Sequence, residues 1–269
     1  MSTRHSPADA AEIKNCCAAA YGNDAMALLL GESYHPGGQA LTERLADALD
    51  LRAGQRVVDV AAGPGATARL LAAQRGVSVD GIELNDSTVA TAQATTAGAG
   101  LTQAVRFHTG DAERIPLPDA EFDSVICECA FCTFPDKPTA AAEFARVLRP
   151  GGRVGITDVT VHPDGLPAEL AGLTGWVACI ADARPLSDYI AILDAAGLRT
   201  LHTQRHDEAL RSMIDTIEAR LKLLRMTAPD QLIAAGVDVD AVLHYTRLAA
   251  HAAATGTLGY ALITAEKPR

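Results

Sequence analysis

Apolar residues recur along this chain in two alternating patterns. Short runs rich in valine and isoleucine, such as Val57–Val60 and Val125–Ile126, have the composition of buried parallel strands. Longer stretches between them, rich in alanine and leucine with charged residues interspersed, are typical of helices. Strands that alternate with helices of about 10–15 residues predict an α/β fold with a doubly wound, mostly parallel sheet.

The pattern places the individual elements. We expect strands at 57–60, 77–82, 105–108, 122–128, 153–157, 199–204 and 258–265. We expect one or two helices over 8–30, helices that end near 51 and 97, and helices over 66–74, 138–148, 186–196, 208–226 and 229–254. Asn85-Asp86-Ser87 is a capping cluster that begins the helix ending near 97.

The stretch from Val57 to Gly65 carries the first chemical signal. The strand ends in Asp59-Val60, a turn of small residues contains Gly63 and Gly65, and a helical composition follows from Ala66. Glycines let a ligand approach the backbone, and the first turn of a helix presents unpaired N–H groups to it. The arrangement favours a nucleotide-binding corner in which Asp59 accepts from a cationic or hydroxyl group. An ordinary tight turn of another α/β protein is the alternative.

Acidic residues also end or follow the next two strands. A carboxylate about 20 residues beyond the glycine turn, as Glu83 is, can accept both ribose hydroxyls of a nucleoside. Asp111 follows the third strand, where it could take an adenine amino group, and the Ala112 N–H could meet the ring edge. The alternative for Glu83 is an ordinary surface glutamate.

Composition excludes several classes of function. The chain has 269 residues, 48% of them hydrophobic, and a formal net charge of −10. This charge argues against a nucleic-acid-binding surface and against anionic membranes, because both need exposed lysine and arginine. Residues 1–9 lack a basic flank followed by an apolar core, and no apolar stretch approaches the ~20 residues of a membrane span. We therefore expect a cytoplasmic protein.

Cysteines are the second chemical signal. The chain has six, and Cys127, Cys129 and Cys132 lie close together at the end of the fourth expected strand. In a reducing cytoplasm they are expected to be thiols. Cys129 and Cys132 follow the strand, where sheets of this kind place ligands, whereas Cys127 lies deeper and is assigned to the core. Small buried core residues are the alternative for all of them.

Five of these motifs together resemble the Rossmann-like S-adenosylmethionine-dependent methyltransferases. The matching segments are Val57–Gly65, Glu83, Gly110–Ala112, Phe122–Ile126 and Val147–Gly152. The resemblance implies a seven-stranded sheet of order 3-2-1-4-5-7-6 with an antiparallel last strand, and S-adenosyl-L-methionine as cofactor. It implies a helical lid at 1–38 and a methyltransferase domain at 39–269 with insertions at about 159–187 and 207–256. The expected cofactor-binding residues are Asp59, Ala61, Gly63, Gly65, Glu83, Leu84, Asp111, Ala112 and Glu128.

The segment Val125–Cys132, with the turn and strand that follow it, is similar to the arsenite methyltransferases. That family has one substrate cysteine just after the fourth strand and another in the insertion after the fifth. The resemblance implies that Cys129 and Cys179 are substrate thiolates, and that a thiol reductant is a partner. A third thiolate from Cys17 or Cys132 stays open. Cys16-Cys17 departs from the family pattern, because it precedes Tyr21 rather than following it.

The chemistry of a thiol site leaves three hypotheses. Thiolates are soft ligands, and trivalent arsenic bound to them keeps a lone pair that can itself attack the methyl group, so no base is needed. Selenium, mercury or an organic thiol would fit the same reasoning. A small-molecule O-, N- or C-methyltransferase is the second hypothesis, with His35, Tyr34 or Asp158 as base. A sensor that binds zinc through its cysteines, and S-adenosylmethionine without turnover, is the third.

Overall fold

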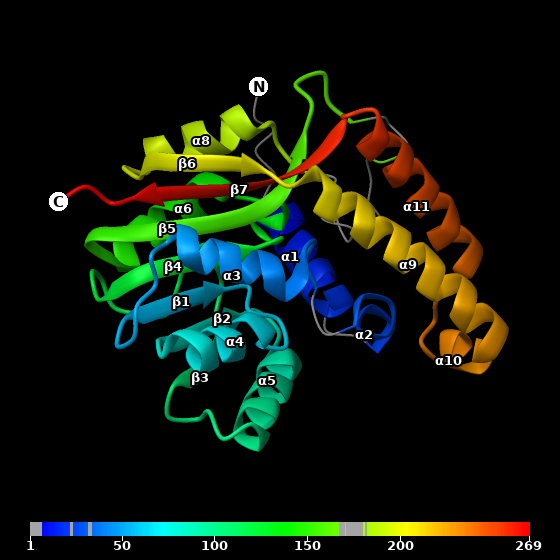
Figure 1. The fold of residues 1–269 in the computed structure, drawn as a ribbon, viewed down its shortest axis with the longest axis horizontal. Coiled ribbons are helices and arrows are strands. Elements are labelled where there is room, and N and C mark those ends of the chain that lie inside the picture. The colour runs from blue at the N-terminus through cyan, green and yellow to red at the C-terminus, as the bar shows by residue number, and fades with distance from the viewer. Residues whose placement is uncertain (1–6, 22–23, 32–33, 167–169, 171–179, 181) are drawn as a thin grey trace.

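Seven strands form one sheet in the order β3-β2-β1-β4-β5-β7-β6 in the computed structural model, which describes residues 7–21, 24–31, 34–166, 170, 180 and 182–269 (Figure 1). The strands are β1 (Arg56–Val60), β2 (Ser78–Glu83), β3 (Val105–Thr109), β4 (Phe122–Glu128), β5 (Leu148–Val161), β6 (Arg199–Arg205) and β7 (Leu258–Glu266). The first five pair in parallel, and β7 is antiparallel to β5 and β6. The predicted fold class and strand order are confirmed.

Helices cover both faces of the sheet. One face carries α3 (Gly38–Ala48), α4 (Ala66–Arg75) and α5 (Asp86–Gly98), and the other carries α6 (Lys137–Val147) and α8 (Leu186–Ala195). Each layer buries its own apolar cluster against alternate residues of the strands. Successive strands are added on one side of β1 as far as β3 and on its other side from β4 onward. This change in strand order makes the place between β1 and β4 a switch point, and ligands bind beside such points.

The remaining helices lie beyond the carboxyl ends of the strands. At the N-terminal end are α1 (Pro7–Tyr21) and α2 (Asp24–Leu30). The helices α9 (Asp207–Thr227), α10 (Pro229–Ala234) and α11 (Val239–Ala254) form an arm that extends away from the sheet in Figure 1. Leu29 of α2 packs with residues of this arm, so the N-terminal helices contact the C-terminal ones.

Local signals explain most boundaries, and two predicted elements differ. Asn85 caps α5, because its side chain accepts from the N–H groups of Ser87 and Thr88, as expected. The fifth strand is longer than the predicted 153–157, since β7 pairs with it as far as Val161. The single helix predicted over 229–254 is wrong: the chain breaks after Ala234, and Asp238 caps a new helix.

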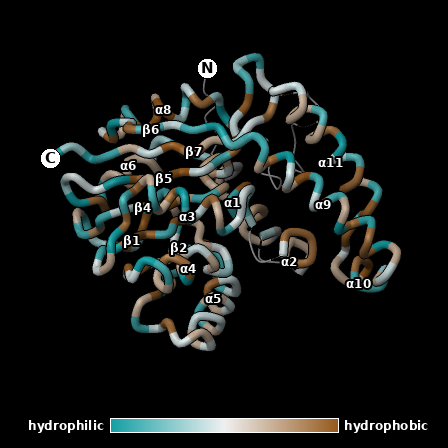
Figure 2. The backbone as a smooth tube through the Cα atoms, viewed as in Figure 1, coloured by the Kyte–Doolittle hydropathy of each residue, from teal (hydrophilic) through white to brown (hydrophobic). Residues whose placement is uncertain are grey.

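Hydropathy follows this architecture. Figure 2 shows the apolar segments concentrated in the central strands, whose residues in β1, β4 and β7 are almost all buried. Among the helices of the described residues, none combines the length and apolar character that a bilayer crossing requires.

Candidate active site

A pocket lies at the carboxyl ends of β1, β2 and β4, and α1 forms one of its walls. It holds about 1120 Å³ of space, counting the part that opens to solvent. The pocket is where the reversal of strand order predicts a ligand site.

The turn between β1 and α4 forms the floor of the pocket. Gly65 has a φ of +81°, and a Cβ placed there would lie 2.3 Å from Cζ of Phe107, so no larger residue fits without displacement. Gly63 has a φ of +52°, and a Cβ placed on it would meet no atom within 4 Å. The turn therefore keeps open space directly above its backbone, as a bound nucleotide requires.

Two buried carboxylates flank this turn. Glu83 accepts from the backbone N–H groups of Gly63 at 3.0 Å and Asn85 at 3.1 Å, and burial raises its pKa. Asp59 is 3% exposed, and its Oδ2 has no hydrogen-bond partner among the residues that the structure describes. Burial raises the pKa of Asp59 well above its usual value, and the charges of Glu128 and Glu83 raise it further. A cationic ligand group would relieve this unfavourable cluster.

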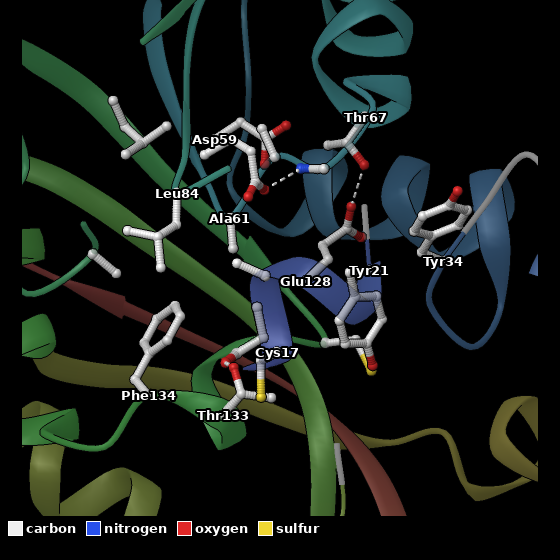
Figure 3. A pocket seen from close by; sticks show the side chains of 18 of the residues that line it. Cys17, Tyr21, Tyr34, Asp59, Ala61, Thr67, Leu84, Glu128, Thr133 and Phe134 are labelled. Atoms are coloured by element: carbon white, nitrogen blue, oxygen red, sulfur yellow. Dashed lines mark hydrogen bonds between the residues drawn. The ribbon is translucent and has the colours of Figure 1, made fainter. Parts of the chain in front are cut away.

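Glu128 at the end of β4 is the third carboxylate of the pocket. Its side chain is 4% exposed, and it accepts from Thr67 Oγ1 at 2.6 Å and from Thr42 Oγ1 at 3.1 Å (Figure 3). His35 Nε2 lies 3.5 Å from Glu128 Oε2. In Figure 3 the Glu128 side chain points toward Thr67, with Asp59 on one side of it and Tyr21 and Tyr34 on the other.

The helix α1 presents one face to the pocket. Lys14, Cys17, Ala18 and Tyr21 all line it, and their spacing of three and four residues places them on one side of a helix. Lys14 Nζ lies 2.8 Å from Asp111 Oδ2, so an ion pair joins α1 to the loop after β3. The predicted adenine-binding residues Asp111 and Ala112 both line the pocket beside this contact.

The structure separates the predicted thiols. Cys17 and Cys129 line the pocket, and Cys129 has a φ of +54°, a conformation that non-glycine residues rarely adopt. Cys132 is 1% exposed and packs in an apolar cluster, and Cys127 is fully buried in the core as expected. Cys179 lies outside the described residues.

The predicted alternative bases are placed differently from one another. Tyr34 and His35 line the pocket. Both ring nitrogens of His35 face protein oxygens, Nδ1 at 3.2 Å from the Pro36 carbonyl and Nε2 at 3.3 Å from Thr42 Oγ1. Asp158 is 1% exposed and accepts from the N–H of Cys132, beneath the pocket wall. His35 would therefore have to lose one of these contacts to accept a proton from an incoming hydroxyl, and Asp158 is not among the residues that line the pocket.

Comparison with known proteins identifies the family. Residues 58–156 match a family model described as a methyltransferase domain. The 27-O-demethylrifamycin SV methyltransferase of Amycolatopsis mediterranei (strain S699) is 33% identical over 230 residues, which are 85% of this chain and 83% of that protein. This chain belongs to the methyltransferase family.

Two further similarities differ in what they support. The arsenite methyltransferase of Halobacterium salinarum (strain ATCC 700922 / JCM 11081 / NRC-1) is 30% identical over 167 residues, which are 60% of this methyltransferase and 42% of that protein. The solved phosphoethanolamine N-methyltransferase 2 of Haemonchus contortus, in complex with S-adenosyl-L-methionine, superposes with a TM-score of 0.76 at 18% identity. The superposition covers 94% of this chain and 57% of the solved chain, and it supports the fold.

S-adenosyl-L-methionine is the cofactor of the methyltransferase. The pocket fits it, because the molecule is a nucleoside with a sulfonium and an ammonium group, and Asp59 Oδ2 is a buried oxygen that lacks a partner. Because the chain belongs to an enzyme family, the hypothesis of a sensor without turnover is not supported. Within the part of the chain that the structure describes, no three histidine, cysteine or acidic side chains are grouped to hold a metal ion.

Several residues of the pocket were not predicted from the sequence. Thr42 and Thr67 bond to Glu128, and Lys14 and Tyr21 come from α1. Thr67 lies in the first helical turn after Gly65, so its place near the ligand could have been inferred. The spacing of Lys14, Cys17 and Tyr21 was also visible, but nothing local indicates that this helical face covers the strand ends.

Proposed function

We propose that this methyltransferase transfers a methyl group from S-adenosylmethionine to a soft acceptor that its thiolates bind, with trivalent arsenic as the favoured acceptor. One observation carries the proposal. Cys17 from α1 and Cys129 from the end of β4 line the same pocket as the three buried carboxylates. Two thiols from separate segments beside a cationic cofactor are what a thiophilic substrate requires.

In this proposal, each carboxylate and the glycine turn contact a different part of the cofactor. Glu83 accepts from the ribose hydroxyls, and Asp111 and Ala112 bind the adenine. Asp59 and Glu128 face the cationic end, because their charges lack a strong cationic partner among the described residues. Ala61, Gly63 and Leu84 line the pocket and form the surface against which the nucleoside lies, and Gly65 shapes the turn beside them.

The chemistry needs a nucleophile and an alignment, and no base. The arsenic lone pair forms the bond to the methyl carbon, the electrons of the carbon–sulfur bond stay on sulfur, and the cofactor becomes a neutral thioether. Arsenic loses two electrons in this step, and a thiol reductant returns it to the trivalent state. The thiols hold the acceptor in line, and α1 excludes water from the reacting atoms.

Contacts of described residues support Cys179 as the second thiolate. Its neighbour Ile180 is 5% exposed and belongs to the apolar cluster against which Cys129 packs. Asp182 lies 2.5 Å from Lys137 Nζ, and that ammonium also donates to the Cys132 carbonyl at 2.8 Å. Both contacts attach the chain after Cys179 to the loop that follows Cys129.

The N-terminal segment 1–38 acts as a lid in this proposal. The pocket-lining face of α1 and the ion pair between Lys14 and Asp111 support this assignment. Asp111 is also the proposed adenine ligand, so the same carboxylate contacts both the cofactor and α1 in this proposal.

Methyl transfer to a small organic molecule is the second candidate function. The name of the rifamycin relative favours a hydroxyl acceptor, and Tyr21 and Tyr34, with ring centroids 6.5 Å apart, offer an aromatic wall. A hydroxyl usually needs a base. His35 could serve only after its Nε2 leaves Thr42 and Glu128, which makes this candidate the weaker one on geometry.

Purified protein with S-adenosylmethionine, arsenite and a thiol tests the proposal, with methylated arsenic read by mass spectrometry. Cys129→Ser and Cys179→Ser should each lose turnover by at least a hundredfold, and Cys17→Ser by tenfold or more. Cys16→Ser is the matched control, since Cys16 adjoins Cys17 in α1 and is outside the pocket lining. Normal turnover in both the Cys129 and Cys179 variants would refute the thiolate site. Loss of methylation of an organic hydroxyl in His35→Ala would support the second candidate.

A further inference from the structure

Glu128 is held in an unusual way for a buried carboxylate. Thr67 Oγ1 donates to its Oε2 at 2.6 Å, and Thr42 Oγ1 lies 3.1 Å from both of its oxygens. These donors come from α4 and α3, the first two helices on one face of the sheet. Hydroxyl groups are neutral, so they orient the carboxylate and leave its charge in place.

Other acidic side chains of the fold are held differently. Glu143 pairs with Arg146 at 2.7 Å, and Asp182 pairs with Lys137 at 2.5 Å. In those pairs the cation compensates the carboxylate. At Glu128 the recorded ion-pair partner among the described residues is His35, whose Nε2 is 3.5 Å away and also within reach of Thr42.

The position of Glu128 defines what its charge can act on. Asp59 and Glu83 flank the nucleotide-binding turn, and Glu128 lines the same pocket as these carboxylates and Cys17. A methyl group that passes from the cofactor to an acceptor at the thiols moves within this pocket. A carboxylate there acts on the sulfonium before transfer and on the neutral thioether after it.

We propose that Thr42 and Thr67 are positioning residues that hold the Glu128 carboxylate toward the sulfonium charge, so that the pocket distinguishes the cationic cofactor from its neutral product. The inference rests on the cofactor placement in the proposed function, and it is independent of the acceptor. A fixed charge at this place binds S-adenosylmethionine more tightly than S-adenosylhomocysteine, and transfer of the methyl group weakens the hold on the product. The two threonines thus contribute to product release as well as to binding.

Calorimetric affinities for both molecules test the proposal, because they differ only in the methyl group and its charge. In Thr67→Val and Thr42→Val the affinity for S-adenosylmethionine should fall roughly tenfold, as expected for one lost hydrogen bond to a charged group. The affinity for S-adenosylhomocysteine should change by less than about threefold. Thr67→Ser and Thr42→Ser should restore the wild-type ratio, and Glu128→Gln should lower the ratio furthest.

Thr96→Val is the matched control. Thr96 is a buried threonine of α5 whose hydroxyl has no hydrogen-bond partner in the described part of the chain, and it lies outside the pocket lining. This variant should leave both affinities unchanged. An equal fall for both molecules in the Thr42 and Thr67 variants would show a merely structural role, and no fall would show that the contacts are irrelevant; either result overturns the proposal. If a valine variant fails to fold, Glu128→Gln decides the point, because unchanged discrimination in that variant also overturns it. A lowered ratio without arsenic methylation would reject the proposed acceptor and leave this inference intact.

Discussion

Carboxylates at the two ends of the parallel strands are held in opposite ways. The amino edge is the side of the sheet where these strands begin, and the carboxyl edge is the side where they end. At the amino edge, Asp123 accepts from the N–H of Arg56 at 2.7 Å and pairs with Arg149 at 2.6 Å. The Arg56 guanidinium also pairs with a carboxylate, and it lies 4.4 Å from the ring centroid of Phe122. At the carboxyl edge, Glu83 accepts from backbone N–H groups, and one oxygen of Asp59 has no partner.

The difference shows where the fold gives up stability. Buried carboxylates without cations repel one another, which is why burial and neighbouring charges raise the pKa of Asp59. Such an arrangement persists in a binding site because a ligand supplies the missing charge. The amino edge has no comparable cluster among the described residues, and its charges serve the folded chain itself.

The largest effect is expected at the glycine turn. In Gly65→Ala the new Cβ clashes with Phe107, and the left-handed backbone is strained as well. We expect the free energy of unfolding to fall by roughly 2–5 kcal/mol and cofactor binding to be lost. Gly54→Ala, at the amino edge, has a similar φ of +84° and no atom within 4 Å of the new Cβ. It should cost about 1–2 kcal/mol from strain and leave binding intact. Chemical denaturation measures both, and equal losses would show that Phe107 moves aside.

Asparagine substitutions separate binding from stability. Asp59→Asn removes a buried charge that repels its neighbours, so the free energy of unfolding at pH 7 should hold or rise while the cofactor affinity falls at least tenfold. Asp123→Asn weakens the hydrogen bond that Asp123 accepts from the Arg56 N–H at the amino edge. The free energy of unfolding should therefore fall by about 1 kcal/mol, with no change in cofactor affinity. Thermal unfolding measures the stability of both variants, and calorimetric titration measures their cofactor affinities. A loss of stability in Asp59→Asn would contradict the account of the carboxyl edge.

Cofactor affinity should rise with pH. The pKa of Asp59 is raised well above its usual value of 3.8 by burial and by the facing groups Glu128 of β4 and Glu83 of β2, with Cys127 of β4 also close by. At low pH the ligand-free protein carries a proton there, and a cationic ligand expels it. Binding should therefore strengthen by up to about tenfold per pH unit and proton released, as pH increases through the raised pKa, and level off above it.

Titration in buffers of different ionisation enthalpy counts the released protons. Asp59→Asn should release one fewer, which serves as the control. His35 also faces Glu128, so the same titration of His35→Gln isolates the contribution of Asp59. Affinity that stays constant or falls as pH rises would contradict the prediction.

The smallest effect is expected at the ion pair of α1. Lys14→Met removes the ion pairs with Asp111 and Glu113, whose side chains are 34% and 14% exposed, and solvent screening keeps the expected loss modest. Cofactor dissociation should become about two- to fivefold faster in stopped-flow measurements. Lys14→Arg should retain the slow rate, and high salt should reduce the difference between wild type and Lys14→Met. An unchanged rate in Lys14→Met would argue against a lid role for this contact.

Much of the fold follows from patterns local to the chain. The valine-rich runs indicated the strands, and Asn85 indicated where α5 begins, because capping depends on neighbouring backbone groups. The length of β5 and the break after Ala234 could not be read in this way, since pairing with β7 and contacts of the arm determine them.

The sequence by itself determined the doubly wound sheet, the methyltransferase family and the acidic residues at the strand ends, because each depends on residues close together in the chain. Only the tertiary structure decided which side chains complete the pocket. It brought Thr42 and Thr67 to Glu128, Lys14 to Asp111 and Cys17 to the pocket of Cys129, and it buried Cys132 elsewhere. These contacts join segments far apart in sequence, and no local pattern encodes which helical face will cover which strand end.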